Sequence, residues 1–213
     1  MAELLTVEGH VLRKTPYSES SLIIALLSDQ GQQHFMLRGA LKIGKRNFPA
    51  VDLFRRVRII YRPTTRSDLH TGRDAECIDS YAGIPRHQTH YRAAAWLSRM
   101  ILDNTAINDP APLLHTAATT AFQRLGGDEE VPCVPVVLGV GFVLLQEAGS
   151  LPSFDEQPDI RQSVQRMIAC ATSAALPYPD YTAAVWLDLR DWLQAFLLQH
   201  DYKVPRDIEK IGV

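Results

Sequence analysis

A dense group of cations lies in residues 36–66. This stretch holds nine Lys and Arg residues against a single acid, Asp52. Arg guanidinium groups bind phosphate oxygens in bidentate pairs, and clustered cations can follow a phosphate backbone. A basic face that only contacts solvent is the alternative interpretation. The candidate phosphate-binding residues are Arg38, Lys42, Lys45, Arg46, Arg56, Arg58, Arg62 and Arg66.

Residues 54–62 are rich in β-branched and aromatic side chains, which is typical of a strand. Successive side chains of a strand point to opposite faces. Arg56, Arg58 and Arg62 therefore share one face, and the apolar residues between them share the other. A row of guanidinium groups on an open face has the geometry to follow a phosphate backbone.

The aromatic candidates for stacking on bases in the same region are Phe35, Phe48, Phe54 and Tyr61. Alternation places Phe35 and Tyr61 with the core residues, so we expect both to be packing residues. Phe48, in a loop, has the better chance of reaching a base. Strong charge with little stacking predicts binding with little sequence preference. If about six phosphates are contacted, log affinity falls against log salt with a slope of about −4 to −5.

The segment from Gly39 to Lys45 fits the phosphate-binding loop G-x-x-x-x-G-K. The motif fails at the next position, where Arg46 replaces the Ser or Thr that would hold magnesium. Residues 47–49, Asn-Phe-Pro, are also a poor helix start, and without that helix its dipole and free amides are missing. We expect instead a flexible basic hairpin that presents Lys42, Lys45 and Arg46 together.

Motifs for metal binding and catalysis give little support for an enzyme. His87 and His90 stand at i and i+3, but no third ligand follows at matching spacing, and a pair on a helix surface is the commoner explanation. The three cysteines are far apart and form no C-x-x-C pair, which argues against a disulfide framework and a cysteine zinc site. We expect no catalytic residue, no cofactor and no bound metal.

Short strands must position the candidate residues. Turn signals separate five segments with strand character. The residues between these segments have no strong helical periodicity, so no crossover helix that would allow parallel pairing is expected. These features favour a small five-stranded antiparallel barrel. The expected strands are residues 6–14, 21–28, 33–40, 54–62 and 69–81.

After Pro85 the apolar residues recur at helical spacing, and five helices are expected. The first is expected at residues 86–105. The second is opened by Asp109 and Pro110 and stops at residues 126–127. The third and fourth are expected at residues 135–148 and 159–176. Asp180 opens the fifth. Its apolar stripe consists of Val185, Leu189, Trp192 and Phe196, joined by Trp186, Leu193 and Leu197. The fold class is therefore α+β, with a β domain at residues 1–81 and an all-helical domain at residues 82–213.

The composition, with 46% hydrophobic and 22% charged residues, is that of an ordinary soluble globular protein. The first residues lack the basic start and apolar run of a secretory signal, and the uncharged residues 131–145 fall short of the roughly 20 that span a bilayer. The formal net charge of −2 divides unevenly, into +3 for residues 1–80 and −5 for residues 81–213. We expect a cytoplasmic protein, associated with the nucleoid, whose acidic half provides scaffolding or docks partners.

Several motifs in order resemble the bacterial RecO family. Residues 11–31 contain the segment Tyr-Ser-Glu-Ser between two strands, followed by a glycine turn. Arg38-Gly39-Ala40 is followed by a basic loop, and residues 54–61 match the family's next strand. In the second half, residues 142–152 are similar to the family's helix that runs into a leucine–glycine turn, and residues 189–203 resemble its final helix. The likeness covers nearly the whole chain.

This resemblance implies an oligonucleotide/oligosaccharide-binding (OB) barrel joined to a helical domain. It also implies binding to single- and double-stranded DNA, annealing of complementary strands, and work with RecR and single-stranded-DNA-binding protein to load RecA. The sequence departs from the family in one respect. Many members carry four zinc-binding cysteines just after the leucine–glycine turn, whereas here residues 154–158 read Phe-Asp-Glu-Gln-Pro.

Three hypotheses follow. The first is a DNA-binding and annealing mediator without bond-making chemistry. The second is a protein-interaction module in which the basic face of an OB barrel docks an acidic partner. The third is a hydrolase whose site is dispersed along the chain, and magnesium-dependent cleavage of nucleic acid would support it.

Overall fold

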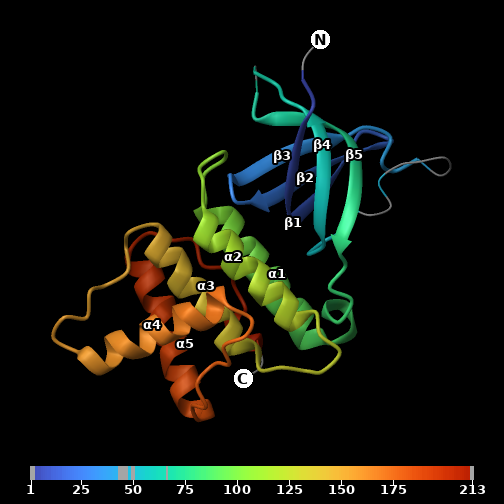
Figure 1. Cartoon of the computed structure of the whole chain (residues 1–213). Coiled ribbons are helices and arrows are strands. Elements are labelled where there is room, and N and C mark those ends of the chain that lie inside the picture. The colour runs from blue at the N-terminus through green and yellow to red at the C-terminus, as the bar shows by residue number, and fades with distance from the viewer. Residues whose placement is uncertain (1–2, 43–47, 49–50, 66, 212–213) are drawn as a thin grey trace. The chain divides into compact units, whose positions relative to one another are not determined.

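The computed structural model describes residues 3–42, 48, 51–65 and 67–211 of the chain. These residues form two compact units, and each is described by itself. The first, called here the barrel unit, comprises Met1–Ser80 with Thr105–His115. The second, the helical unit, comprises Tyr81–Asn104 with Thr116–Val213. Figure 1 shows the strands in blue to green and the helices in green to red.

Five strands close into a barrel in the order β1-β2-β3-β5-β4, and the expected fold class is confirmed (Figure 1). Four of the pairings are antiparallel, but β3 and β5 pair in parallel, so the expectation of a wholly antiparallel barrel was wrong in this one pairing. The reason is geometric, because a closed ring with an odd number of strands cannot alternate direction throughout. The strands are β1 Leu5–Tyr17, β2 Ser21–Ser28, β3 Gly31–Leu37, β4 Arg56–Arg62 and β5 Leu69–Asp79.

The barrel core is made by the alternation that the sequence indicates. Along β4 the buried side chains are Val57, Ile59 and Tyr61, and the residues between them face outward. Phe35 of β3 is fully buried, and its ring meets that of Tyr61 edge to face at a centroid distance of 5.0 Å. The prediction that Phe35 and Tyr61 are packing residues is confirmed.

Phe48 also belongs to this core. Its side chain is 7% exposed and packs in the same apolar cluster as Val51, so the expectation that it reaches a base was wrong. A single aromatic residue in a polar stretch of sequence carries no periodic signal, and the burial of its ring is favoured by the ordinary hydrophobic effect.

The segment Thr105–His115, called here the strap, packs with the barrel, although it follows the helix Gln88–Asn104 and includes the start of the helix Pro112–Leu125. Ile107 forms a parallel bridge with Gln32, and the Asn108 amide donates to the Gln32 carbonyl oxygen at 2.9 Å. The backbone approaches closely at Gly31, whose φ is +85°. A Cβ atom there would lie 1.9 Å from the carbonyl oxygen of Asp109, so no other residue fits without a shift.

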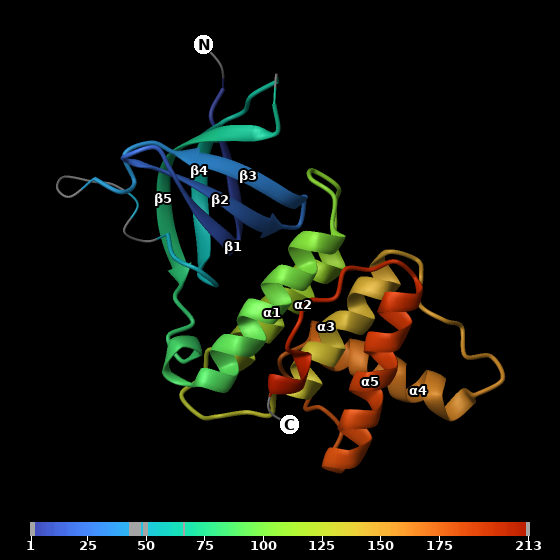
Figure 2. The ribbon, with the colours of Figure 1, turned by 180° about the vertical axis from the view of Figure 1, so that it is seen from behind.

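In the helical unit, α3 contacts α1, α4 and α5 and is buried along almost its whole length. Seen from behind in Figure 2, α5 runs beside α3. The bounds lie close to those expected, although α2 begins after Asp109 and Pro110 because the strap pairs with β3. None of the helices that the structure describes is long and apolar enough to cross a membrane. The helices are α1 Gln88–Asn104, α2 Pro112–Leu125, α3 Cys133–Glu147, α4 Pro158–Thr172 and α5 Ala183–Gln199, with short 3-10 turns at Ile84–Arg86 and Ile208–Lys210.

The apolar stripe expected on α5 divides into two faces. Trp186, Leu193 and Leu197 are buried, and Gly141 of α3 leaves room for Leu193, because a Cβ atom there would lie 2.5 Å from the Leu193 side chain. Val185 and Trp192 instead remain 41% and 37% exposed. Apolar residues cover more than half of the helix circumference, and hydrophobic periodicity cannot tell which part of so wide a stripe meets the core.

Candidate nucleic-acid interface

The structure describes five of the eight candidate phosphate-binding residues, and Lys45, Arg46 and Arg66 lie outside the described residues. Arg38 and Lys42 follow the end of β3 and are exposed. The other three, Arg56, Arg58 and Arg62, lie on the outer face of β4, as alternation predicted. The hairpin expected to present Lys42, Lys45 and Arg46 together falls largely outside the described residues as well.

Acidic side chains of the two neighbouring strands neutralise part of the row of arginine side chains on β4. The register pairs Arg58 with Glu8 of β1 on one side and with Glu76 of β5 on the other. The Arg58 guanidinium donates to the Glu8 carboxylate at 2.7 Å and to the Glu76 carboxylate at 2.6 Å. Arg56 also reaches Glu8, at 3.3 Å. The hydrogen bond to Glu8 and the charges of Glu8 and Glu76 raise the pKa of Arg58 above its ordinary value.

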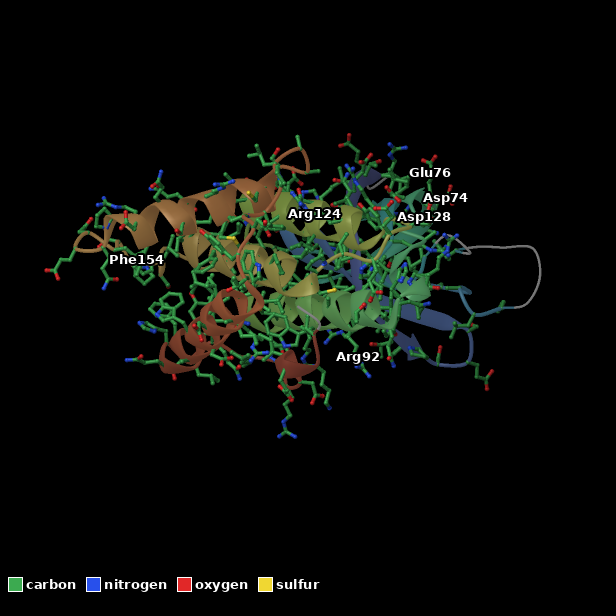
Figure 3. The ribbon with its side chains drawn as sticks, turned by 90° about the horizontal axis from the view of Figure 1, so that it is seen from below. Asp74, Glu76, Arg92, Arg124, Asp128 and Phe154 are labelled. Atoms are coloured by element: carbon green, nitrogen blue, oxygen red, sulfur yellow. The ribbon has the colours of Figure 1, made fainter. Side chains whose placement is uncertain are left out.

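Two further acids of β5 flank β4. Asp74 pairs in register with Ile60 and Asp79 with Arg56. Figure 3 shows Asp74 near Glu76 on the barrel. The outer face of β4 is therefore a mixed-charge surface, and a phosphate would have to compete with Glu8 and Glu76 for Arg58. The sequence did not indicate this pairing, because it depends on which strands become neighbours.

Other cations of the barrel are not engaged in this way. Arg13 of β1, Arg62 of β4 and Arg73 of β5 are exposed, as are Arg38 and Lys42. None of these five cations forms a salt bridge with an acidic side chain among the residues that the structure describes. Arg13 and Arg73 were missed by the sequence analysis, since both lie outside the charge-dense residues 36–66. Each of the two had one usable signal, its position in an expected strand.

Arg13 borders a half-buried surface over β1, β2 and β3, called here the β1–β3 face. The register sets Thr15, Ile23 and Met36 in one row across these strands, and Arg13, Ala25 and His34 in the next. Burial, followed by the nearby charge of Arg13, lowers the pKa of His34, whereas the charge of Asp68 opposes this shift. The neutral form of His34 is therefore favoured, and the face has a weakly polar centre with a guanidinium group at its edge.

The comparison with protein families agrees with this architecture. Residues 1–81 match the family model described as "Recombination protein O N terminal". The barrel is thus similar to the N-terminal domain of RecO proteins. The resemblance to the RecO family is thereby confirmed over the strands that carry the candidate residues. No curated protein matches the chain closely enough to count as a relative.

Outside the barrel, the two histidines considered as metal ligands have structural partners. His90 is fully buried, not on the helix surface as expected, with Nδ1 2.8 Å from the Leu125 carbonyl oxygen and Nε2 accepting from the Val131 amide at 2.9 Å. His87 bonds the Asp128 carbonyl oxygen at 3.1 Å. In the described ranges, no three His, Cys, Asp or Glu side chains are grouped so that they could hold a metal ion.

Proposed function

We propose that this chain binds single- and double-stranded DNA through its barrel, without bond-making chemistry and with little sequence preference, and promotes annealing of complementary strands. The observation that carries the proposal is the RecO N-terminal match over the barrel, together with exposed cations that no described acid neutralises. Arg38 and Lys42 follow β3, and Arg13 borders the β1–β3 face. These three are the described cations from which we expect the largest contribution to DNA affinity, with Lys45, Arg46 and Arg66 as further predicted contacts.

A mobility-shift titration tests this proposal. A single-stranded 30-mer at about 50 mM salt should be retarded, and log affinity should fall against log salt with a slope of about −4 to −5 for roughly six phosphate contacts. Loss of Arg13, Arg38 and Lys42 together should flatten that slope by about 2 to 3. No retardation at low salt would contradict the proposal.

The paired arginines provide an internal comparison. Arg58→Gln should change DNA affinity less than Arg38→Gln, because Glu8 and Glu76 already occupy the Arg58 guanidinium. Arg161→Gln, in the helical unit and paired with Asp155, is the matched control and should leave affinity unchanged. An Arg58 effect larger than that of Arg38 would mean that DNA displaces the two carboxylates.

The proposed partners beyond DNA are RecR and single-stranded-DNA-binding protein, with recombinase loading as the outcome, and the proposed location is the cytoplasm at the nucleoid. Support for these comes from the RecO match alone. A strand-annealing assay with DNA coated by single-stranded-DNA-binding protein, with and without RecR, tests them. Annealing that is no faster than without the protein would refute the annealing activity while leaving DNA binding intact.

The second candidate is an interaction module, in which the barrel docks an acidic protein. The mixed charge of the outer face of β4 favours it, because an Arg row with carboxylate neighbours suits a patterned protein surface better than a uniform polyanion. Unchanged DNA affinity after joint loss of Arg56, Arg58 and Arg62 would support this candidate only if loss of Arg13, Arg38 and Lys42 also had no effect.

A further inference from the structure

Two apolar stripes of the helical unit face one groove. Each stripe has the spacing i, i+4, i+7, one on α4 and one on α5, and the groove between them has a volume of about 560 Å3. Val164 and Met167 are buried at its floor, while Ile160 remains 43% exposed at its edge. The six stripe residues are Ile160, Val164 and Met167 on α4, and Val185, Leu189 and Trp192 on α5.

Aromatic packing holds one wall of this groove in place. The Trp192 ring stacks on Phe142 and Phe196 at centroid distances of 6.0 and 5.3 Å. Phe154, in the loop between α3 and α4 (Figure 3), lies 5.8 Å from Trp192 between ring centroids. Its backbone has a φ of +53°, in the left-handed region. A non-glycine residue is rarely held there without compensating contacts, so the loop contributes a fixed aromatic side chain to the wall.

The charged groups that line the groove are acidic. Asp159 of α4 and Asp188 of α5 both line it, and both are exposed. The nearest cations in sequence already have acidic partners, because Arg161 pairs with Asp155 and Arg190 with Asp191. Among the described residues that line the groove there is no Lys or Arg. An apolar floor with carboxylates along it is complementary to an apolar stripe flanked by cations.

We propose that this groove docks an amphipathic helix of a partner protein, with apolar residues at i, i+3, i+4 and i+7 and with Lys or Arg beside them. Each stripe runs from i to i+7, a rise of seven residues, which corresponds to about two turns of a docked helix, roughly 10 Å. Exposed apolar surface of this kind marks a protein interaction site. The carboxylates give selectivity, because an acidic helix would place like charges against Asp159 and Asp188.

A synthetic probe tests the proposal on the full chain. The probe is a fluorescein-labelled helical peptide of Leu and Lys, with Leu at the four anchor positions. Two comparison peptides have the same composition with the Leu residues scattered round the helix, or Glu in place of every Lys. Fluorescence anisotropy at about 0.15 M salt should give an affinity for the cationic probe at least about tenfold above that for either comparison.

Substitutions of exposed residues localise the binding. Ile160→Ser with Val185→Ser should weaken binding of the cationic probe, and Asp159→Lys with Asp188→Lys should transfer the preference to the Glu peptide. Leu198→Ser, on the same helix α5 and 55% exposed outside the groove, is the matched control and should change nothing. Circular dichroism verifies that each variant keeps its helices.

Three results would overturn the proposal. Equal binding of the scattered and the amphipathic peptides would mean attraction to net charge alone. Tighter binding of the Glu peptide to the unaltered protein would mean an acidic partner. Self-association in light scattering that Val185→Ser abolishes would mean that a second copy covers the groove. The DNA affinity of the barrel is measured separately in each variant, so failure here does not affect the proposed DNA binding.

Discussion

The barrel unit and the helical unit carry different kinds of surface. In the barrel, exposed charges are organised by strand register, with Glu8, Arg58 and Glu76 in one line across three strands. In the helical unit, the most distinctive open surface is the apolar groove between α4 and α5. The barrel therefore carries the charges on which the proposed DNA binding rests, whereas the helical unit carries the apolar area on which the proposed docking of a helix rests.

The largest expected effect is on the barrel core. Phe35→Ala removes a fully buried ring and its edge-to-face contact with Tyr61, and should lower the free energy of unfolding of the barrel by about 3–5 kcal/mol. All three tryptophans, Trp96, Trp186 and Trp192, lie in the helical unit, so tryptophan fluorescence reports on that unit alone.

Urea titration followed by both circular dichroism and tryptophan fluorescence separates the two units. The strand signal should be lost at lower urea in Phe35→Ala, while the fluorescence midpoint stays close to that of the unaltered chain. Met36→Ala, at the half-buried neighbouring position, is the control and should cost much less. An equal shift of both midpoints would show that the two units unfold as one.

A smaller effect is expected where the strap meets the barrel. Gly31→Ala adds a Cβ atom at a φ of +85° and within 1.9 Å of the Asp109 carbonyl oxygen, so it should cost about 2 kcal/mol or more. Gly149→Ala is the matched control, since its φ is +67° but nothing lies within 4 Å of the added atom, and it should cost about 1 kcal/mol. Hydrogen exchange of the Asn108 amide should accelerate in Gly31→Ala only.

The smallest expected effect is on the pH dependence of folding stability, which should differ between the two units. Burial is the main cause that lowers the pKa of His10, His34, His70 and His115, and all four belong to the barrel unit. In the unfolded chain these groups titrate near 6.5, so the folded barrel binds fewer protons between that pH and the lower folded pKa values. Stability is therefore complete above about pH 6.5 and decreases as the pH falls below it.

His10 should contribute most to this decrease, because burial and the charges of His115 and Arg56 all lower its pKa. His10→Gln should flatten the pH dependence of barrel stability between pH 7 and 5, by up to about 1.4 kcal/mol per pH unit. His200→Gln in the helical unit should leave the slope unaltered. Equal slopes in the unaltered chain and His10→Gln would show that another group titrates there.

The sequence predicts those parts of the fold that repeat along the chain. Alternation placed Val57, Ile59 and Tyr61 inside and the arginines of β4 outside, because a half-buried strand has only two faces. It could not place Phe48, a lone aromatic residue in a loop. On α5 it could not divide one wide stripe into a buried face and an open one, since Val185 and Leu193 are equally apolar.

The pairing of acids with the candidate cations could not be predicted for a related reason. Charge density along the chain identified residues 36–66, but whether a cation is available to a ligand depends on its neighbours in space. Glu8 lies 50 residues before Arg58 in the chain and reaches it only because β1 and β4 are neighbours in the closed barrel. Arg13, in contrast, lies outside the dense segment and forms no salt bridge with a described acid.

The strap has a practical consequence for dividing this protein. The RecO N-terminal match stops at residue 81, yet the barrel unit also includes Thr105–His115. A fragment cut at residue 81 would lack the Asn108 partner of Gln32 and would leave the His10 ring without His115, whose ring centroid lies 5.5 Å away. Transplanting the barrel into another protein would thus require a second, non-contiguous piece of sequence, and a binding measurement on the shorter fragment would describe an incomplete fold.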